Sequence, residues 1–207
     1  MNTSQAAGQG LRERKKQQTR EALSWAALRL AVDRGLGNVV VEDIAAEAGV
    51  SPRTYNNYFS SKAEAITWRH LNRARRTADL LRAQPPGEPL WEAITRAVVA
   101  QAGDEHATPE PEWIAGVRLM LSEPELQGEF LKASVAAERG CAAVVAERTG
   151  ADTGRDMYPW LVAAAVSAAI RVANEQWLRA EPPVPLAPLL REALTRVAAG
   201  LPAPTAR

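Results

Sequence analysis

The chain has 207 residues, of which 46% are hydrophobic and 24% charged, and its formal net charge is +1. This length is enough for two packed units, each with its own core. The single cysteine, Cys141, excludes an intramolecular disulfide and a cysteine-cluster zinc site. We expect it to be a small buried apolar residue, with a redox-sensing thiol as the alternative.

The first twenty residues are polar and basic, without the apolar core of a signal peptide, so we expect a cytoplasmic protein. We predict a flexible tail over residues 1–11. Basic residues then gather ahead of the first long apolar helix, at Arg12, Arg14, Lys15, Lys16 and Arg20. These side chains could neutralise phosphates of a nucleic acid, which would make binding salt-dependent. A solvated basic tail is the other interpretation.

Residues 42–62 predict two short helices joined by a tight glycine turn. Ile44 and Ala48 recur at helical spacing, and Gly49 suits the position after a helix because glycine reaches the left-handed conformation at little cost. Ser51 is a natural N-cap for the next helix, and the proline after it fits the first helical position. This pattern is a helix-turn-helix, which places one helix against DNA.

The second of these helices has two different sides. Tyr55 and Phe59 fall together and are expected to pack inward. The outward side presents groups that suit base edges and phosphates: Arg53, Thr54, Asn57 and Tyr58. Taken alone, the glycine turn also fits an ordinary helical hairpin with a solvated polar face.

Charge is distributed unevenly along the chain. Residues 1–82 carry 14 Lys and Arg against 8 Asp and Glu, a net of +6, whereas residues 83–207 carry 11 against 16, a net of −5. The basic excess therefore lies in the part that holds the helix-turn-helix. Such asymmetry is typical of a nucleic-acid-binding segment joined to a second domain.

Several short sequences occur together at fixed spacing: Ala26-Ala27 and Gly35 of a long first helix, then Asp-Ile-Ala, Ala-Gly-Val-Ser and Tyr-Phe-Ser-Ser-Lys. In these features, residues 12–72 resemble the N-terminal DNA-binding domain of the TetR family of transcriptional regulators. The resemblance implies a three-helix unit with its recognition helix over residues 51–58. It also implies that Ser51 belongs to the DNA-binding surface and that Lys62, at the start of a fourth helix, contacts a phosphate.

The chain departs from the common family pattern at three positions. Val40 replaces a threonine that caps the second helix, so a capping hydrogen bond worth roughly 1 kcal/mol should be absent. Arg53 replaces a frequent glycine and Asn56 a frequent aromatic residue, so the operator cannot be transferred from other members. The sequence Ser-Pro-Arg-Thr followed by Asn-Tyr-Phe resembles a subgroup that includes the regulator of the mycofactocin system, for which the implied effector is an acyl-CoA-like molecule.

The rest of the chain, residues 73–201, is expected to be the ligand-binding and dimerisation domain that the resemblance implies, followed by a tail over residues 202–207. Abundant alanine favours helices, and clusters of proline and glycine mark their ends. The predicted helices cover residues 88–102, 112–122, 124–148, 156–180 and 186–200. Together with the first four, they make an all-α protein of nine helices.

The last two of these helices are the predicted dimer interface, because apolar residues cover much of the first and one side of the second. The interface residues we expect are Leu161, Ala165, Ala168, Val172, Leu190, Leu194 and Val197. Burial inside one subunit is the alternative. We expect no membrane span, because the apolar run from residue 160 to residue 170 is shorter than the roughly 20 residues that a bilayer requires and continues into Arg171.

A small-molecule pocket is expected among the fourth to eighth helices. Such sites combine aromatic and apolar walls with a few polar groups. The candidate lining residues are Trp68, Trp113, Arg118, Met120, Phe130, Asn174 and Trp177, with Arg118 and Asn174 as polar anchors. A tryptophan taken alone is more often an ordinary core residue than part of a ligand site.

Catalytic and metal-binding motifs are not found in the sequence. The two histidines, His70 and His106, have no metal-ligand spacing, and no glycine-rich phosphate loop follows a strand. We therefore expect no cofactor, no metal and no enzymatic activity. The predicted function is a dimeric repressor that binds double-stranded DNA and is released by a small effector. An activator or dual regulator, a helical enzyme and a protein-binding adaptor are the alternatives.

Overall fold

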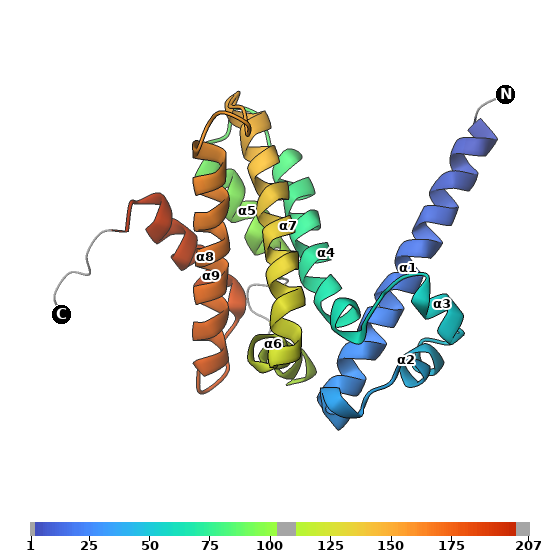
Figure 1. Ribbon diagram of the computed structural model, residues 1–207. Helices are drawn as coiled ribbons and strands as arrows, with labels where there is room; N and C mark the ends of the chain where they lie inside the picture. The colour runs from blue at the N-terminus through green and yellow to red at the C-terminus, as the bar shows by residue number, and fades with distance from the viewer. Residues whose placement is uncertain (1–2, 103–110, 202–207) are drawn as a thin grey trace. The chain divides into compact units, whose positions relative to one another are not determined.

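A computed structural model of the chain describes residues 3–102 and 111–201, with side chains over residues 12–102 and 114–201. Within these ranges the chain forms nine α-helices, one 3-10 helix and no strand (Figure 1). The all-α prediction is confirmed. The elements are α1 (Thr3–Arg34), η1 (Leu36–Asn38), α2 (Val41–Glu47), α3 (Pro52–Asn56), α4 (Lys62–Arg82), α5 (Leu90–Ala102), α6 (Pro111–Ser122), α7 (Pro124–Thr149), α8 (Tyr158–Arg179) and α9 (Leu186–Ala198).

Proline and glycine set the helix ends in the second part of the chain. All five helices predicted there begin and end within two residues of the observed bounds. Gly150, for example, follows α7 with a φ of 69°, a left-handed conformation that ends a helix at little cost for glycine. Local chemistry was therefore sufficient to place these elements.

The start of α1 differs from the prediction. The helix begins at Thr3, within the segment that was assigned to a tail over residues 1–11. No proline stands between residue 3 and residue 12, and glycines at positions 8 and 10 disfavour a helix without ending it. The tail predicted for residues 202–207 lies outside the described residues.

The chain divides into two compact units. The first combines Met1–Arg69 with Ala115–Phe130, and the second combines His70–Ile114 with Leu131–Arg207. The change of unit after Arg69 lies close to the predicted boundary at residue 72. Residues 115–130, however, were predicted to belong wholly to the second domain, and the structure packs them with the N-terminal helices.

The core of the first unit is formed by α1, α2, α3 and the beginning of α4. Leu23, Ile44, Tyr55 and Ile66 are each fully buried. Buried Ser24 on α1 donates a hydrogen bond of 2.6 Å to the carbonyl of Ala65 on α4, so these helices are joined by a polar contact as well as by apolar packing.

The second unit is built around α5, α8 and α9, with α9 packed against both of the others. Its buried side chains include Ile94, Val162 and Leu194. Arg148 on α7 donates hydrogen bonds to the carbonyls of Leu81, Gln84 and Pro85, where α4 ends. Leu81 lies in the last turn of α4 and the other two residues follow it, so Arg148 ties α7 to the end of α4.

Candidate functional site

The turn between α2 and α3 has the geometry of a helix-turn-helix. Gly49 has a φ of 69°, and the backbone N–H of Val50 donates to the carbonyl of Ala45 over 2.9 Å. The Gly49 N–H donates in turn to the carbonyl of Ala46. This pair of bonds is a Schellman motif, which satisfies the last carbonyls of α2 and turns the chain within two residues.

The next helix begins as the sequence predicts. Ser51 is the N-cap of α3, and its Oγ accepts a hydrogen bond of 3.1 Å from the backbone N–H of Thr54. Pro52 occupies the first helical position, where its missing N–H costs nothing. The helix itself spans Pro52–Asn56, and Asn57 continues it as the C-cap with helical backbone angles. The segment is shorter at its end than the predicted 51–58.

The two sides of α3 have the predicted orientation. Tyr55 and Phe59 are 0% and 2% exposed, and their ring centroids lie 5.9 Å apart. Burial and the nearby Glu64 carboxylate raise the pKa of Tyr55 to about 12, so its phenol stays neutral. On the other side Arg53 and Asn57 are exposed and accessible to a partner.

The other proposed contacts on this side have different environments. Thr54 and Tyr58 are half-buried, so they present a smaller surface than Arg53. The Ser51 hydroxyl is exposed but lies 3.0 Å from the Thr54 hydroxyl, in addition to its capping bond. Ser51 therefore already has a structural role as the cap of α3.

Helix α2 lacks a side-chain cap, as predicted. Val40 is its N-cap residue and makes no side-chain capping bond. Two ion pairs with α1 hold the helix instead, joining Asp43 to Arg34 at 3.4 Å and Glu47 to Arg29 at 2.7 Å. Because these four side chains are exposed, each pair contributes only a fraction of a kcal/mol to about 1 kcal/mol.

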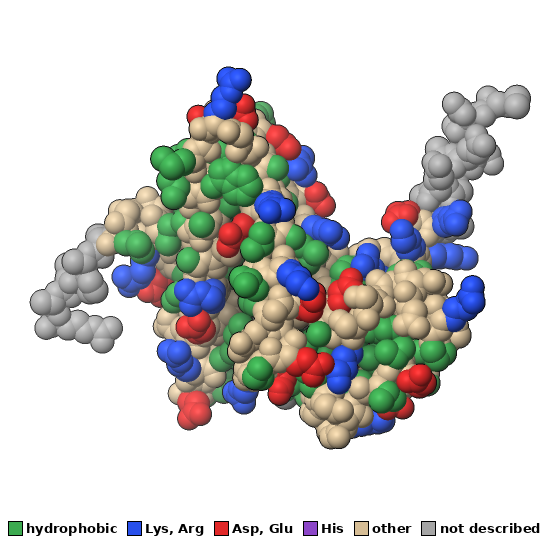
Figure 2. Space-filling model, in the orientation of Figure 1, with side chains coloured by type: hydrophobic (Ala, Val, Ile, Leu, Met, Phe, Trp, Pro, Cys, Tyr) green, Lys and Arg blue, Asp and Glu red, His purple; other side chains and the backbone are tan. Residues whose placement is uncertain are grey.

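The basic run on α1 divides into two groups. Arg14, Lys15 and Lys16 are exposed, and Lys and Arg side chains cover this part of α1 (Figure 2). Arg20 instead faces the unit's own interior. Its guanidinium carbon lies 5.1 Å from the centre of the Phe59 ring and 5.6 Å from that of Trp68. We predicted that Arg20 would contact phosphates together with the rest of the basic run. In the structure its guanidinium packs against Phe59 and Trp68 instead.

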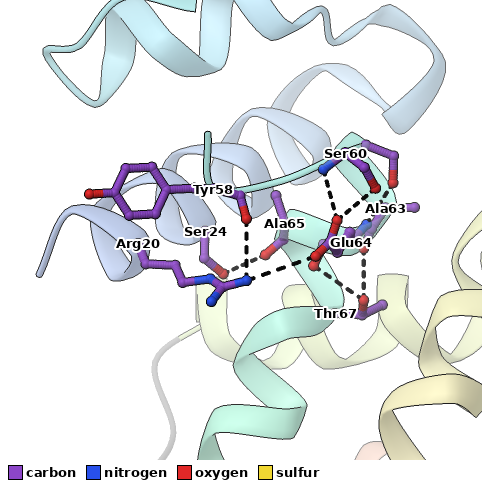
Figure 3. A network of polar contacts seen from close by, with 9 residues as sticks. Arg20, Ser24, Tyr58, Ser60, Ala63, Glu64, Ala65 and Thr67 are labelled. Carbon is purple, nitrogen blue, oxygen red and sulfur yellow. Dashed lines mark hydrogen bonds and ion pairs between the residues drawn. The ribbon is translucent and has the colours of Figure 1, made fainter. Parts of the chain in front are cut away.

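Arg20 takes part in a polar network that joins α1, α4 and the segment after α3 (Figure 3). Its Nη2 donates to the carbonyl of Tyr58 over 3.2 Å and lies 3.9 Å from Glu64 Oε1. The other Glu64 oxygen accepts from both the N–H and the hydroxyl of Ser60, at 2.8 and 2.7 Å. Glu64 thus connects α4 to the chain that leaves the recognition helix.

Sequence reasoning missed this network although part of its signal was present. Ser61-Lys-Ala-Glu64 has the Ser-x-x-Glu spacing of a capping box. In the structure Ser61 Oγ accepts from the Glu64 N–H over 3.0 Å, and the Glu64 carboxylate reaches back to Ser60. The contact to Arg20, 44 positions away, has no signal in the sequence.

Lys62 makes contacts within its own unit. Its Nζ donates to the carbonyl of Leu36 over 2.8 Å and lies 3.7 Å from Glu125 Oε1 on α7. The side chain is 23% exposed. An ammonium group carries three donors, so the bond to Leu36 leaves capacity for another acceptor. The phosphate contact inferred for Lys62 stays a prediction.

The predicted ligand-binding residues divide between the two units. Trp68, Arg118, Met120 and Phe130 belong to the first, Asn174 and Trp177 belong to the second, and the side chain of Trp113 lies outside the described ones. Arg118 is exposed, Met120 is buried and Phe130 is half-buried. Whether these three residues line a pocket stays a prediction.

Three of these residues have clear structural roles. Trp68 is 5% exposed and packs edge-on against Phe59, with ring centroids 6.2 Å apart. Buried Trp177 donates its indole N–H to the carbonyl of Val184 over 3.0 Å, which ties the end of α8 to the segment before α9. The amide of Asn174 donates to the carbonyl of Ile170 one turn earlier. The indole N–H of Trp68, in contrast, is buried without a hydrogen-bond partner among the described residues. A ligand-binding role for these three residues stays a prediction.

The predicted dimer residues separate into exposed and buried positions. Leu161 and Val172 are 63% and 48% exposed, and hydrophobic side chains gather over the upper part of α8 (Figure 2). Ala168 is also exposed, and Ala165 and Val197 are half-buried. Together, Leu161, Ala164, Ala168 and Val172 form a stripe at helical spacing, which we name the α8 apolar face.

Leu190 and Leu194 are a correction to the predicted interface. They are 4% and 0% exposed within a single chain, because α9 turns its leucines toward α5 and α8. Both side chains therefore belong to the core of the subunit. An amphipathic helix has the same apolar spacing whether it packs on its own chain or on a partner, so periodicity could not separate these cases.

His70 and Arg73 give the second unit a partly buried basic cluster on α4. Burial and the neighbouring Arg73 lower the pKa of His70 to about 4, and its Nε2 lies 3.4 Å from the hydroxyl of Ser134 on α7. Burial and Arg76 lower the pKa of Arg73 to about 10. His70 is therefore neutral near pH 7.

The described part of the chain offers no group of three or more His, Cys, Asp or Glu side chains that could hold a metal ion. Over the same residues, no helix combines the length and the apolar character that crossing a membrane requires. Burial and Glu138 raise the pKa of Cys141 to about 11, which keeps this thiol protonated at neutral pH.

Both parts of the chain match models of known protein families. Residues 25–65 match the model described as bacterial regulatory proteins of the tetR family. Residues 88–202, more than half of the chain, match the model described as the MftR C-terminal domain. The first match covers the helix-turn-helix, and the second covers the helices from α5 onward.

Two named proteins are similar to the chain over most of its length. The HTH-type transcriptional regulator TcmR of Streptomyces glaucescens is 32% identical over 180 residues, which cover 84% of this chain and 80% of TcmR. MftR of Mycobacterium tuberculosis, named as a regulator of mycofactocin biosynthesis, is 32% identical over 193 residues, which cover 91% of this chain and 93% of MftR.

Solved structures share the fold at low sequence identity. The fatty acid degradation regulator FadR of Bacillus halodurans aligns with a TM-score of 0.58 at 18% identity, covering 88% of this chain and 96% of that one. FadR of Thermus thermophilus, a TetR-family repressor solved with lauroyl-CoA, aligns with a TM-score of 0.52 at 19% identity, covering 90% and 97%. The family models and the named relatives, together with this fold, show that the chain belongs to the TetR family of bacterial regulatory proteins, which are DNA-binding transcriptional regulators, and carries a C-terminal domain of the MftR type.

Proposed function

We propose that this chain acts as a dimeric repressor that binds a near-palindromic operator and is released by a small hydrophobic or acyl-CoA-like effector. The main support for DNA binding is the exposed polar side of α3. Arg53 and Asn57 face solvent there, while the buried side chains of Tyr55 and Phe59 pack the opposite side into the core of the unit. Such a regulator would work in the cytoplasm, where a bacterium keeps its chromosome.

The proposed DNA surface combines base recognition with backbone contacts. Arg53 suits guanine edges or phosphate and Asn57 suits adenine, with Thr54 and Tyr58 beside them. Phosphates would be contacted by the exposed basic residues of α1, namely Arg14, Lys15 and Lys16, and by the remaining donors of Lys62. Ser51 contributes indirectly, by capping α3.

Dimerisation is proposed through the α8 apolar face. Its exposed leucine and valine would be covered by the same face of a second copy, and the small alanines between them allow close helix approach. A two-fold axis then requires two half-sites on the DNA, about one helical turn apart or slightly more.

The effector class is proposed from relatives and from the C-terminal domain type. The Thermus thermophilus FadR structure holds lauroyl-CoA, and this chain shares its fold. An effector can weaken operator binding only by its differential affinity for two conformations, and a 100-fold weakening corresponds to about 2.7 kcal/mol of coupling.

An electrophoretic mobility shift experiment with the DNA upstream of the chain's own gene tests the proposal. We expect a specific complex of one dimer, or a pair of dimers, that is lost when an acyl-CoA of suitable length is added. An operator affinity that stays constant across an acyl-CoA series would reject that effector class. If no specific complex forms with this DNA, the proposal that the chain is a repressor is rejected.

A further inference from the structure

The segment that follows the recognition helix is held by side chains from two other helices. Helix α3 ends at Asn56, and residues 57–61 connect it to the start of α4 at Lys62. Within this connection Arg20 of α1 donates to the carbonyl of Tyr58, and Glu64 of α4 accepts from the N–H of Ser60 (Figure 3). The connection is therefore held by two side-chain hydrogen bonds, one at the Tyr58 carbonyl and one at the Ser60 N–H.

Arg20 itself is confined by its surroundings. Its side chain is 30% exposed, and its guanidinium carbon lies within 6 Å of both the Phe59 and Trp68 ring centres, within the range of cation–π attraction. Glu64 lies 3.9 Å from the Nη2 atom that reaches Tyr58. Aromatic contact, ion pair and hydrogen bond together restrict the guanidinium to one place.

We propose that Arg20 is a positioning residue for DNA recognition: it sets the orientation of α3 by holding the Tyr58 carbonyl, and Glu64 keeps Arg20 in place. A helix of five residues has little stability of its own, so its direction depends on what holds its ends. Ser51 caps the N-terminal end of α3, and the Arg20–Glu64 pair holds the segment that follows its C-terminal end. A positive group near the C-terminal end of a helix also interacts favourably with its dipole.

This role differs from that of the neighbouring basic residues on the same helix. Lys16 is exposed, whereas the Arg20 guanidinium faces the aromatic core. A direct phosphate contact contributes about 1 to the salt slope of binding and acts on every DNA sequence. A positioning residue affects the cognate site, because only base-edge contacts depend on a precise orientation of α3.

The test compares Arg20→Gln with Lys16→Gln, each of which removes one positive charge from α1. We expect Arg20→Gln to weaken cognate operator binding on the order of 10-fold, to change binding to unrelated DNA by less than about 2-fold, and to leave the salt slope unchanged. Lys16→Gln should weaken binding to both DNAs and reduce the slope by about 1. Arg20→Lys, which keeps the charge but loses the planar guanidinium, should fall between wild type and Arg20→Gln on the cognate site.

Two outcomes would overturn the proposal. One is an equal loss on cognate and unrelated DNA with a reduced slope, which would make Arg20 a phosphate contact. The other is cognate affinity unchanged from wild type. If Arg20→Gln does not fold, Glu64→Gln provides the same comparison, since it removes the charge that holds Arg20 and leaves an amide oxygen for Ser60.

The inference rests on the proposed function for its DNA measurements, so a measurement without DNA accompanies them. Backbone hydrogen exchange should become faster across residues 58–60 in Arg20→Gln, and no faster than wild type in Lys16→Gln. If wild type binds no DNA, the proposed function fails, and the exchange data still decide whether Arg20 holds this segment. Unchanged exchange would then reject the role of Arg20.

Discussion

The backbone of Gly116 in α6 lies directly against the side chain of Leu28 in α1. A Cβ atom at position 116 would stand 2.9 Å from Leu28 Cδ2 and 3.3 Å from its Cγ. Leu28 is 2% exposed, so it has little room to move away. The absence of a side chain at position 116 is therefore what allows α6 to approach α1 this closely.

Substitution of Gly116 should destabilise the first unit according to size. Gly116→Val should lower the free energy of unfolding by about 1–3 kcal/mol, because the branched side chain overpacks against Leu28. Gly128→Ala is the matched control: it lies on α7 in the same unit with nothing near its missing Cβ, and should gain up to about 1 kcal/mol from helix propensity. Urea denaturation of both variants measures these changes, and a neutral Gly116→Val would contradict the close contact.

Asn57→Ala should reduce sequence discrimination. The exposed amide is proposed to read a base edge, so cognate binding should weaken by roughly 1–3 kcal/mol while non-specific binding stays nearly intact. Fluorescence anisotropy with the operator and with a scrambled duplex of the same length compares the two. An equal loss on both duplexes would remove Asn57 from the base-reading residues.

Lys62→Ala should weaken binding to all DNA sequences and reduce the salt slope by about 1, if its remaining donors contact a phosphate. The same variant also loses the hydrogen bond to the Leu36 carbonyl, so its unfolding free energy must be measured alongside. An unchanged slope with reduced stability would show that Lys62 serves only the packing between α4 and η1.

Leu161→Glu should convert the proposed dimer to a monomer. It places a carboxylate on the α8 apolar face, where a second copy would leave it buried without a partner. Sedimentation velocity gives the oligomeric state. Ala100→Glu, at an exposed position of α5, adds the same charge away from this face and should leave the state unchanged. If the Leu161→Glu variant sediments as wild type does, the α8 apolar face is not the dimer interface.

Stability should depend on pH through His70. Its pKa of about 4 in the folded chain lies below the ordinary 6.5, so below pH 6.5 the unfolded chain takes up a proton that the folded chain does not. The free energy of unfolding should therefore fall from pH 7.5 to pH 5.5, by on the order of 1 kcal/mol. His70→Gln should remove this part of the slope, and an unchanged slope in that variant would show that other groups cause it.

Local chemistry determined the helices and the turn at the site. Gly49, Ser51 and the proline and glycine clusters act on a few neighbouring residues, so their effect can be read from the sequence, and the observed helices confirm it. The inward placement of Tyr55 and Phe59 was also predictable, because helical periodicity separates two sides of a short helix when their chemistry differs.

Which apolar side of a helix faces which neighbour was decided only by the tertiary structure. Leu190 and Leu194 pack inside the subunit, residues 115–130 join the first unit, and Arg20 turns toward the Tyr58 carbonyl and Glu64. Each of these arrangements depends on contacts between residues far apart in the chain. Periodicity and capping signals extend over only a few residues, so a single sequence carries no local mark of such contacts.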